Sequence, residues 1–244
     1  MHPLYVNELL SVWEGGYTEP PYRRAILLLS AACPEASDDQ LANLSIGQRD
    51  ARLLTLREWT FGSKLNCLTE CPVCGEQLEF AMNTDDIRVS DIKKQSDSHS
   101  LALDGYHIEY RLLTTADIEE TNSYADKKSM DTALIQRCII SVRINGEEIP
   151  ARELPHDVIN TLIGHMAEND PQADTQLSLT CPACKHEWNV HFDVVSLFWS
   201  EIQAWAARTM KEVHMLASTY GWSEADILSM SPLRRRIYLG MVVS

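Results

Sequence analysis

The chain has 244 residues, of which 45% are hydrophobic and 23% are charged, and its formal net charge is −14. This length and composition suit one large or two small globular domains with an apolar core. The sequence has no run of about 18 apolar residues, which excludes a membrane-spanning helix. The N-terminal residues also lack the basic and apolar blocks of a secretory signal. The seven cysteines are therefore expected to be thiols or metal ligands in a reducing compartment, not disulfides.

The N-terminal third is predicted to be helical. Helical patterns cover residues 7–13, 20–32, 38–44 and 45–61, with Gly15-Gly16, Pro34 and Gly62 as the stop signals between them. The last of these segments carries a broad apolar stripe that is typical of a helix packed on a core: Ala51, Leu53, Leu54, Leu56, Trp59 and Phe61.

The middle of the chain alternates between strand and helix patterns. Asp104-Gly105 lies between two alternating runs and predicts a β-hairpin. Thr114 and Asp117 have capping-box spacing and predict the start of a helix. Strands are expected at 77–82, 139–144 and 175–180, and helices at 131–138 and 154–170.

This middle part is also the most acidic. Residues 114–174 contain twelve Asp or Glu against five Lys or Arg, hence a local charge of −7. An acidic surface repels phosphate backbones, so we expect no nucleic-acid partner. The sequence also lacks the phosphate-binding, dinucleotide-binding and hydrolase motifs of common enzymes, so we expect no small-molecule substrate.

The C-terminal region returns to helix. A long helix is predicted over 193–220, ended by Gly221, with shorter helices beginning at Ser223 and Ser231. The arginine triplet 234–236 is expected on a solvated helix face. Large apolar residues of the long helix lie on more than one face, so either the N-terminal helices or another protein must cover the second face. We expect partner contacts at three tryptophans: Trp199, Trp205 and Trp222.

Two Cys-Pro-x-Cys segments carry the strongest chemical signal. Cys71 and Cys74 form the first pair and Cys181 and Cys184 form the second, 106 residues later (181 − 74 − 1). Two such pairs on two turns supply the four thiolates of a closed, tetrahedral structural zinc site. Each pair leads into a predicted strand. The spacing predicts a zinc ribbon that is split by an insertion, with structural Zn²⁺ as the cofactor.

Other interpretations of these residues stay open at this point. Cys67, His186 or His191 could replace one ligand, and a redox function of the Cys-x-x-Cys pairs is the alternative to metal binding. His107 and Glu109 give a His-x-Glu pattern as in zinc nucleobase deaminases, but the pattern lies in a predicted hairpin strand and no proline precedes Cys181. Cys33 and Cys138 lie in apolar runs and are expected to be inert core thiols.

The arrangement as a whole resembles a known family. The segments at residues 44–80, 179–202 and 212–239, which include both cysteine pairs and "YGWSEADIL", resemble the baseplate-hub and hub-assembly-chaperone family of T-even-type phages. Relatives of that family occur in prophages and contractile injection systems. The resemblance implies a non-enzymatic role in building the baseplate hub, with baseplate or hub proteins as partners. It implies a location in the bacterial host cytoplasm or in the finished virion or tail-like particle.

The expected fold class is α+β, with helical N- and C-terminal parts around a split four-cysteine zinc ribbon and a mixed α/β insertion. The expected divisions are a helical region 1–66, the ribbon 67–83 plus 174–193, the insertion 84–173 and a helical region 194–244. The expected function is that of a structural or assembly protein of a contractile machine. The alternatives are a zinc-ribbon regulator that contacts nucleic acid or the transcription machinery, and a zinc enzyme. A closed four-thiolate site argues against the enzyme, because it leaves no coordination position for a substrate.

Overall fold

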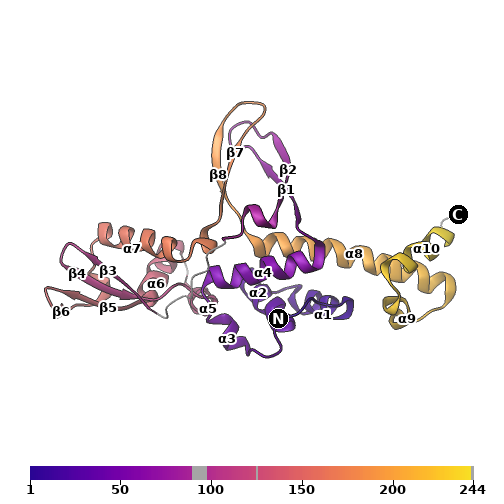
Figure 1. Ribbon diagram of the computed structural model, residues 1–244, viewed down its shortest axis with the longest axis horizontal. Coiled ribbons are helices and arrows are strands. Elements are labelled where there is room, and N and C mark those ends of the chain that lie inside the picture. Colours follow the sequence, from indigo (N-terminus) through magenta and orange to yellow (C-terminus); the bar gives the residue numbers. More distant parts are fainter. Residues whose placement is uncertain (90–97, 125, 243–244) are drawn as a thin grey trace.

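The computed structural model describes residues 1–89, 98–124 and 126–242. The longest helix, α8 (Val194–Tyr220), runs along the long axis of an elongated molecule (Figure 1). Two β-hairpins rise from the middle of the molecule, close to the start of this helix (Figure 1). A small sheet with its helices lies at one end of the molecule, and two short helices lie at the other (Figure 1). The fold is α+β, as predicted. Parts of the predicted insertion (90–97 and 125) and the last two residues of the C-terminal region lie outside the described residues.

Four N-terminal helices pack with the first half of α8 to form the largest apolar cluster. These helices are α1 (Val6–Gly16), α2 (Pro21–Ala32), α3 (Asp38–Ala42) and α4 (Ile46–Phe61). The centre of the cluster is formed by fully buried leucines of α2 and α4 and by Phe198 and Ile202 of α8. Because α2 and α8 both cover α4, this cluster fixes the base from which the hairpins rise.

The predicted stripe of α4 is correct except at Trp59. Leu53, Leu54 and Leu56 are fully buried, whereas the Trp59 side chain is 46% exposed. The neighbouring helices cover only part of the α4 surface, and Trp59 lies beyond it. The helix ends where predicted, at Gly62, whose φ of 87° is readily adopted only by glycine.

Two separate two-stranded antiparallel sheets form the hairpins. Their strands are β1 (Lys64–Glu70), β2 (Gln77–Asn83), β7 (Gln176–Thr180) and β8 (Glu187–His191). Along every strand exposed side chains alternate with half-buried ones, or with a fully buried one at Leu65 of β1, so each hairpin has one face in water and one face turned inward. Isolated two-stranded hairpins are at best marginally stable in water. These hairpins therefore depend on what joins them at the base and at the tip.

The insertion between the hairpins contains a four-stranded antiparallel sheet in the order β3-β4-β5-β6. Its elements are η1 (Thr84–Asp86), β3 (His99–Leu103), β4 (Tyr106–Tyr110), α5 (Thr115–Thr121), α6 (Lys127–Cys138), β5 (Ile139–Ile144), β6 (Glu147–Glu148), η2 (Ala151–Glu153), α7 (His156–Asn169) and η3 (Pro171–Asp174). The Asp104-Gly105 hairpin is confirmed, with φ values of 50° and 83° as its two-residue turn requires. A second apolar cluster packs α7 on this sheet, with Ile108, Tyr110 and Leu162 at its centre.

The predicted capping box at the start of α5 is confirmed, and it is part of a buried ionic network. The Thr114 hydroxyl accepts from the Asp117 backbone N–H at 3.4 Å, and the Asp117 carboxylate accepts from the Thr114 N–H at 3.0 Å. Arg111 donates twice to the same carboxylate, at 2.6 and 2.7 Å, and Arg137 donates once. Burial raises the pKa of Asp117, but hydrogen bonds from Arg111, Thr114 and Arg137 outweigh it and lower the pKa to about 2.

The end of α8 forms a third, small cluster with α9 (Glu224–Ser229) and α10 (Pro232–Val242). The structure corrects the prediction for the arginine triplet. Arg234 and Arg236 are exposed, but Arg235 is only 3% exposed and donates to Glu212 of α8 at 3.1 Å and to the Met230 carbonyl at 2.9 Å. Arg235 thus lies on the face of α10 that packs on α8. Burial of its charge is tolerated because the Glu212 carboxylate neutralises it.

Candidate metal centre

The two cysteine pairs form the tips of the two hairpins, and their backbones follow the same path. In the first tip the Cys71 N–H donates to the Glu76 carbonyl at 2.9 Å, and the Gly75 N–H donates to the Cys71 carbonyl at 3.0 Å. In the second tip the equivalent bonds, from Cys181 and Lys185, have the same lengths of 2.9 and 3.0 Å. Each turn therefore holds both cysteines of its pair on one side of a tight loop.

One position in each tip requires a left-handed backbone. Gly75 has a φ of 74° and Lys185 has a φ of 63°. Glycine adopts this region without steric cost, whereas any residue with a Cβ atom is strained there by about 1–2 kcal/mol. The second tip retains the same geometry despite a lysine at this position. Interactions beyond the backbone preference of Lys185 itself must therefore stabilise this turn.

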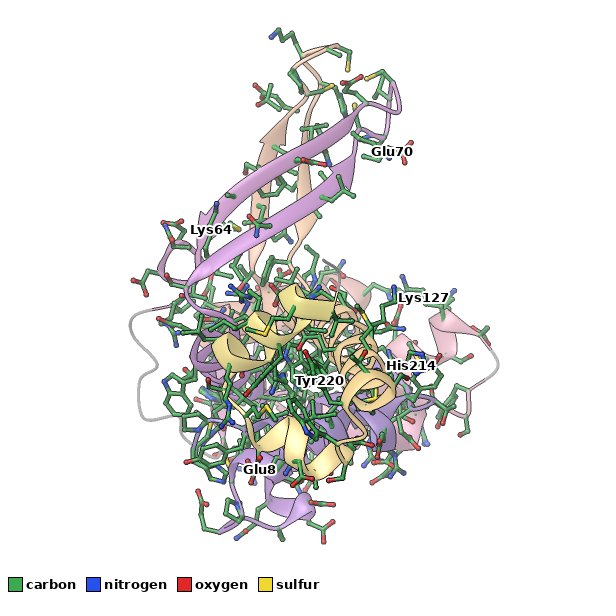
Figure 2. The ribbon with its side chains drawn as sticks, turned by 90° about the vertical axis from the view of Figure 1, so that its right-hand side faces the viewer. Glu8, Lys64, Glu70, Lys127, His214 and Tyr220 are labelled. Carbon is green, nitrogen blue, oxygen red and sulfur yellow. The ribbon has the colours of Figure 1, made fainter. Side chains whose placement is uncertain are left out.

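The tips bring the four thiols together. All four Sγ atoms lie within 4.8 Å of one another, with Cys71 to Cys184 at 3.7 Å and Cys74 to Cys181 at 3.5 Å. Tetrahedral coordination with zinc–sulfur bonds of about 2.3 Å requires sulfur–sulfur distances of about 3.8 Å. The four thiols thus have nearly the spacing that a zinc ion needs. Figure 2 shows the hairpins rising from the base near Lys64 to the tips beyond Glu70, where sulfur atoms gather.

The thiols of this group differ in how readily they ionise. Backbone N–H groups, that of Cys184 first, lower the pKa of Cys181 to about 7. A backbone N–H lowers the pKa of Cys74, but the Cys184 and Cys181 thiols outweigh it and raise the pKa to about 12. A thiolate therefore forms first at Cys181, and the pKa values of Cys74 and Cys184 beside it are raised. Thiolates this close together repel one another. A divalent cation in the centre would remove that repulsion.

The alternative ligands lie apart from this group. Cys67 is on the inner face of β1, and its Sγ lies 4.0 Å from the Met82 sulfur. His186 stacks on Trp188 with ring centroids 5.9 Å apart, and His191 faces Asp174 at 3.9 Å. None of these three belongs to the four-thiol group that the described residues form. A redox disulfide is not formed either, since the cysteines of the described residues are all free thiols.

The base of the hairpins contains a buried arginine that the sequence patterns did not single out. Arg57 of α4 is 1% exposed and forms a two-pronged ion pair with Glu201 of α8, at 2.8 and 2.5 Å. It also donates to the Gly62 and Lys64 carbonyls, where the chain leaves α4 for β1. One side chain therefore joins α4, α8 and the first hairpin. A charged residue inside an apolar stripe was the only sequence signal for it.

The three tryptophans predicted to contact a partner have different surroundings. Trp199 is 4% exposed, lies against Gly16 of α1 and stacks under the Arg24 guanidinium at 4.6 Å. The N-terminal helices thus cover the second face of α8 at this point. Trp205 is half-buried at the edge of the first cluster. Trp222 is half-buried in an aromatic group with Tyr220 and Tyr238, at ring distances of 4.5 and 4.9 Å.

The remaining candidates are not part of any site with the thiols. His107 and Glu109 lie on β4 of the four-stranded sheet, away from the hairpin tips (Figure 1). Cys33 and Cys138 are buried, and burial raises the pKa of both thiols, to about 11 for Cys138. Their burial is as predicted, and a raised pKa disfavours the reactive thiolate. No helix among the described residues is both long and apolar enough to cross a membrane.

The fold and this centre define a mainly helical protein in which two hairpins, far apart in sequence, meet at a four-thiol group. The comparison with protein families identifies it further. The family model described as "T4 bacteriophage base plate protein" matches residues 18–199, from the loop before α2 to the first turns of α8 and through both hairpins. The chain belongs to this family, and its resemblance to T-even-type baseplate proteins is confirmed. The comparisons with curated proteins and with solved structures gave no match.

Proposed function

We propose that the chain is a non-enzymatic structural or assembly protein, with a chaperone-like role, in the baseplate hub of a phage-tail-like contractile machine. We further propose that Cys71, Cys74, Cys181 and Cys184 bind one structural Zn²⁺. The match to the baseplate family over residues 18–199 carries the first proposal. The spacing of the four sulfurs carries the second. Membership of a baseplate family also supports incorporation into the virion or tail-like particle.

The donor set favours a structural metal over a catalytic one. Four thiolates complete the tetrahedral coordination of zinc, whereas catalytic sites keep one position for water or substrate. Cys71 and Cys181 are buried and Cys74 and Cys184 are exposed, so the ion would be covered by the two hairpins and open to metal exchange on one side. The same thiolates would hold the strained Lys185 turn in place.

Zinc would stabilise a connection that the hairpins cannot supply themselves. The ion would join two points separated by 106 residues. Because the four ligands come together only in the folded chain, the free energy of metal binding would add to the free energy of folding. Each hairpin has only one half-buried face, so apolar burial alone leaves the tips weakly held. The metal would thereby fix the hairpins as one rigid projection on the body, suited to fit a partner protein.

Other baseplate proteins are the partners that the family suggests. We place the contact on the C-terminal part of the chain, where Trp205 and Trp222 are half-buried at the surface and the family match has already ended. Half-exposed aromatic residues of this kind anchor protein interfaces. Trp199, which was also predicted to contact a partner, is 4% exposed, and we propose instead that it holds α8 to the N-terminal helices.

Native mass spectrometry tests the metal. The wild-type chain is expected to carry one zinc ion, and Cys181→Ser is expected to lose it. Cys67→Ser is the matched control, since it removes a neighbouring thiol that lies outside the four-thiol group. Zinc that persists at full occupancy in a Cys71→Ser/Cys181→Ser double variant would contradict the ligand assignment.

Co-expression tests the function. A tagged chain is produced together with the baseplate components encoded beside it, and hub proteins are expected in the purified complex. Particles made without the chain are expected to lack a complete hub. If complete particles form without it and no baseplate component co-purifies, the proposed role in hub assembly is wrong.

A further inference from the structure

An exposed apolar ridge lies on α10. Leu233, Ile237 and Met241 are 66%, 52% and 63% exposed, and they follow one another at intervals of four residues. At about 100° per residue, these three side chains fall within one sector of roughly 80° on the helix. Exposed large apolar residues scattered singly are ordinary, but a continuous row on one helix face marks an interaction site.

Basic residues flank this ridge on both sides. On the same helical projection, Arg234 lies about 20° beyond one edge of the ridge and Arg236 about 60° beyond the other. Arg235 points the opposite way, toward Glu212 of α8. The outer face of α10 is therefore apolar in the middle and positive at its margins, on a chain whose net charge is −14. Its charge complement is an apolar groove with acidic margins.

The chain itself has such a groove, between α6 and α7. The groove is a cavity of about 460 Å³ with a mainly apolar lining, to which α6, α7, η3 and the start of α4 contribute, and with a buried floor at Leu112 and Cys138. Leu134 lies on the α6 side, and Ile163, which is 43% exposed, lies on the α7 side. An amphipathic helix with large apolar side chains four residues apart is the usual occupant of a groove of this kind.

The margins of the groove carry the opposite charge to α10. Asp131 of α6 and Asp174 of η3 line the groove and are both exposed. They belong to the segment 114–174, whose net charge is −7. Arginines beside the ridge and aspartates beside the groove would meet when the ridge enters the groove, and complementary charges of this sort set orientation and suppress other partners.

The ridge cannot enter the groove of its own chain. Arg235 fixes α10 to Glu212, which lies eighteen residues and hence about 27 Å along α8 from Val194. The helices α6 and α7 lie beyond the opposite end of α8 (Figure 1). The two surfaces thus lie toward opposite ends of one elongated molecule, and only a second molecule can bring them together.

We propose that the occupant of the α6–α7 groove is α10 of a second copy of this chain, bound head to tail. The contact is heterologous: each copy donates its ridge to one neighbour and its groove to another. Repetition of such a contact forms a closed ring or an open row of copies. The ridge lies outside the region matched by the baseplate family. The inference depends neither on zinc nor on the proposed role in hub assembly.

Two single variants and their mixture test this arrangement by sedimentation of the full-length, zinc-supplemented protein. The wild type is expected to self-associate as its concentration rises over about two orders of magnitude. Ile237→Asp destroys the ridge, Ile163→Asp destroys the groove, and each alone is expected to weaken association by about 30-fold or more. When the two variants are mixed, the intact groove of the first accepts the intact ridge of the second. A complex of two chains, and no larger species, is expected.

Matched controls separate this contact from a general effect of added charge or misfolding. Tyr5→Asp replaces another exposed apolar residue, 76% exposed and at a helix N-cap where aspartate is favoured, and is expected to associate like the wild type. Asp131→Lys is expected to weaken association, and mixing it with Arg234→Glu/Arg236→Glu is expected to restore part of it. Circular dichroism should show the same helix content in every variant.

Three results would overturn the proposal: a wild type that stays monomeric throughout, single variants that associate like the wild type, or a mixture that contains no two-chain complex. A variant that loses helix content is replaced by its charge-reversal counterpart on the same surface, so that a folding defect cannot be mistaken for a lost contact.

Discussion

Substitution of Gly47 by alanine is expected to destabilise the fold, although alanine favours helices. Gly47 lies in the first turn of α4, and a Cβ atom there would lie 2.0 Å from Oδ1 of Asp170, 2.7 Å from its Cγ and 3.1 Å from the Ala173 backbone nitrogen. Asp170 is 6% exposed and packs at the start of η3. The alanine variant must therefore displace a buried carboxylate or the backbone behind it.

The size of the effect follows from the bonds that Asp170 makes. Its carboxylate accepts from the Gly47 N–H at 2.9 Å and from the Ser45 hydroxyl at 3.2 Å. Hydrogen bonds to a charged group contribute about 1.5–3 kcal/mol each, and replacing glycine by alanine in a helix returns about 1 kcal/mol. If both bonds are lost, the free energy of unfolding should fall by roughly 2–5 kcal/mol.

Urea unfolding of the zinc-saturated protein measures this change. Gly164→Ala is the matched control, because Gly164 lies within α7 and a Cβ atom added there would have no neighbouring atom within 4 Å. The same substitution should there raise the free energy of unfolding by up to about 1 kcal/mol. The two variants are thus expected to shift stability in opposite directions. A Gly47→Ala protein as stable as the wild type would show that the contact with Asp170 does not constrain the junction between α4 and η3.

Other predictions follow from single residues. The pKa of Asp117 is about 2 in the folded protein against an ordinary value of 3.8. Its ionised carboxylate therefore contributes about 2 kcal/mol to the free energy of unfolding above pH 3.8, and this contribution is lost as the pH falls toward 2. Asp117→Asn should remove this part of the acid dependence when urea unfolding is measured over a series of pH values. Lys185→Gly should raise the melting temperature by relieving about 1 kcal/mol of strain, and Gly75→Ala should lower it. Trp199→Ala should lower the free energy of urea unfolding by about 3–5 kcal/mol, whereas Trp205→Ala should chiefly reduce co-purification of a baseplate partner. If the two variants changed stability and co-purification equally, the assignment of Trp199 to the core and of Trp205 to the interface would be wrong.

Local features of the sequence determined the elements and the candidate ligands. The Asp104-Gly105 turn, the capping box at Thr114 and the stop at Gly62 depend on the conformations of a few neighbouring residues, and all three are confirmed. The two Cys-x-x-Cys pairs could be recognised as candidate ligands for the same reason, because the local turn alone places the two thiols of each pair together. The sequence also carried the family resemblance, which the match over residues 18–199 confirms.

The tertiary structure decided which surfaces meet, because burial depends on neighbours that are distant in the chain. It placed the two cysteine pairs with all Sγ atoms within 4.8 Å, which spacing within each pair could not establish. Trp199 is buried under the N-terminal helices. Helical periodicity predicted an exposed Arg235 and a buried Trp59, but Arg235 is buried against α8 and Trp59 is exposed. A helical pattern states which side chains share a face. Only the packing of the other helices determines whether that face is covered, and by what.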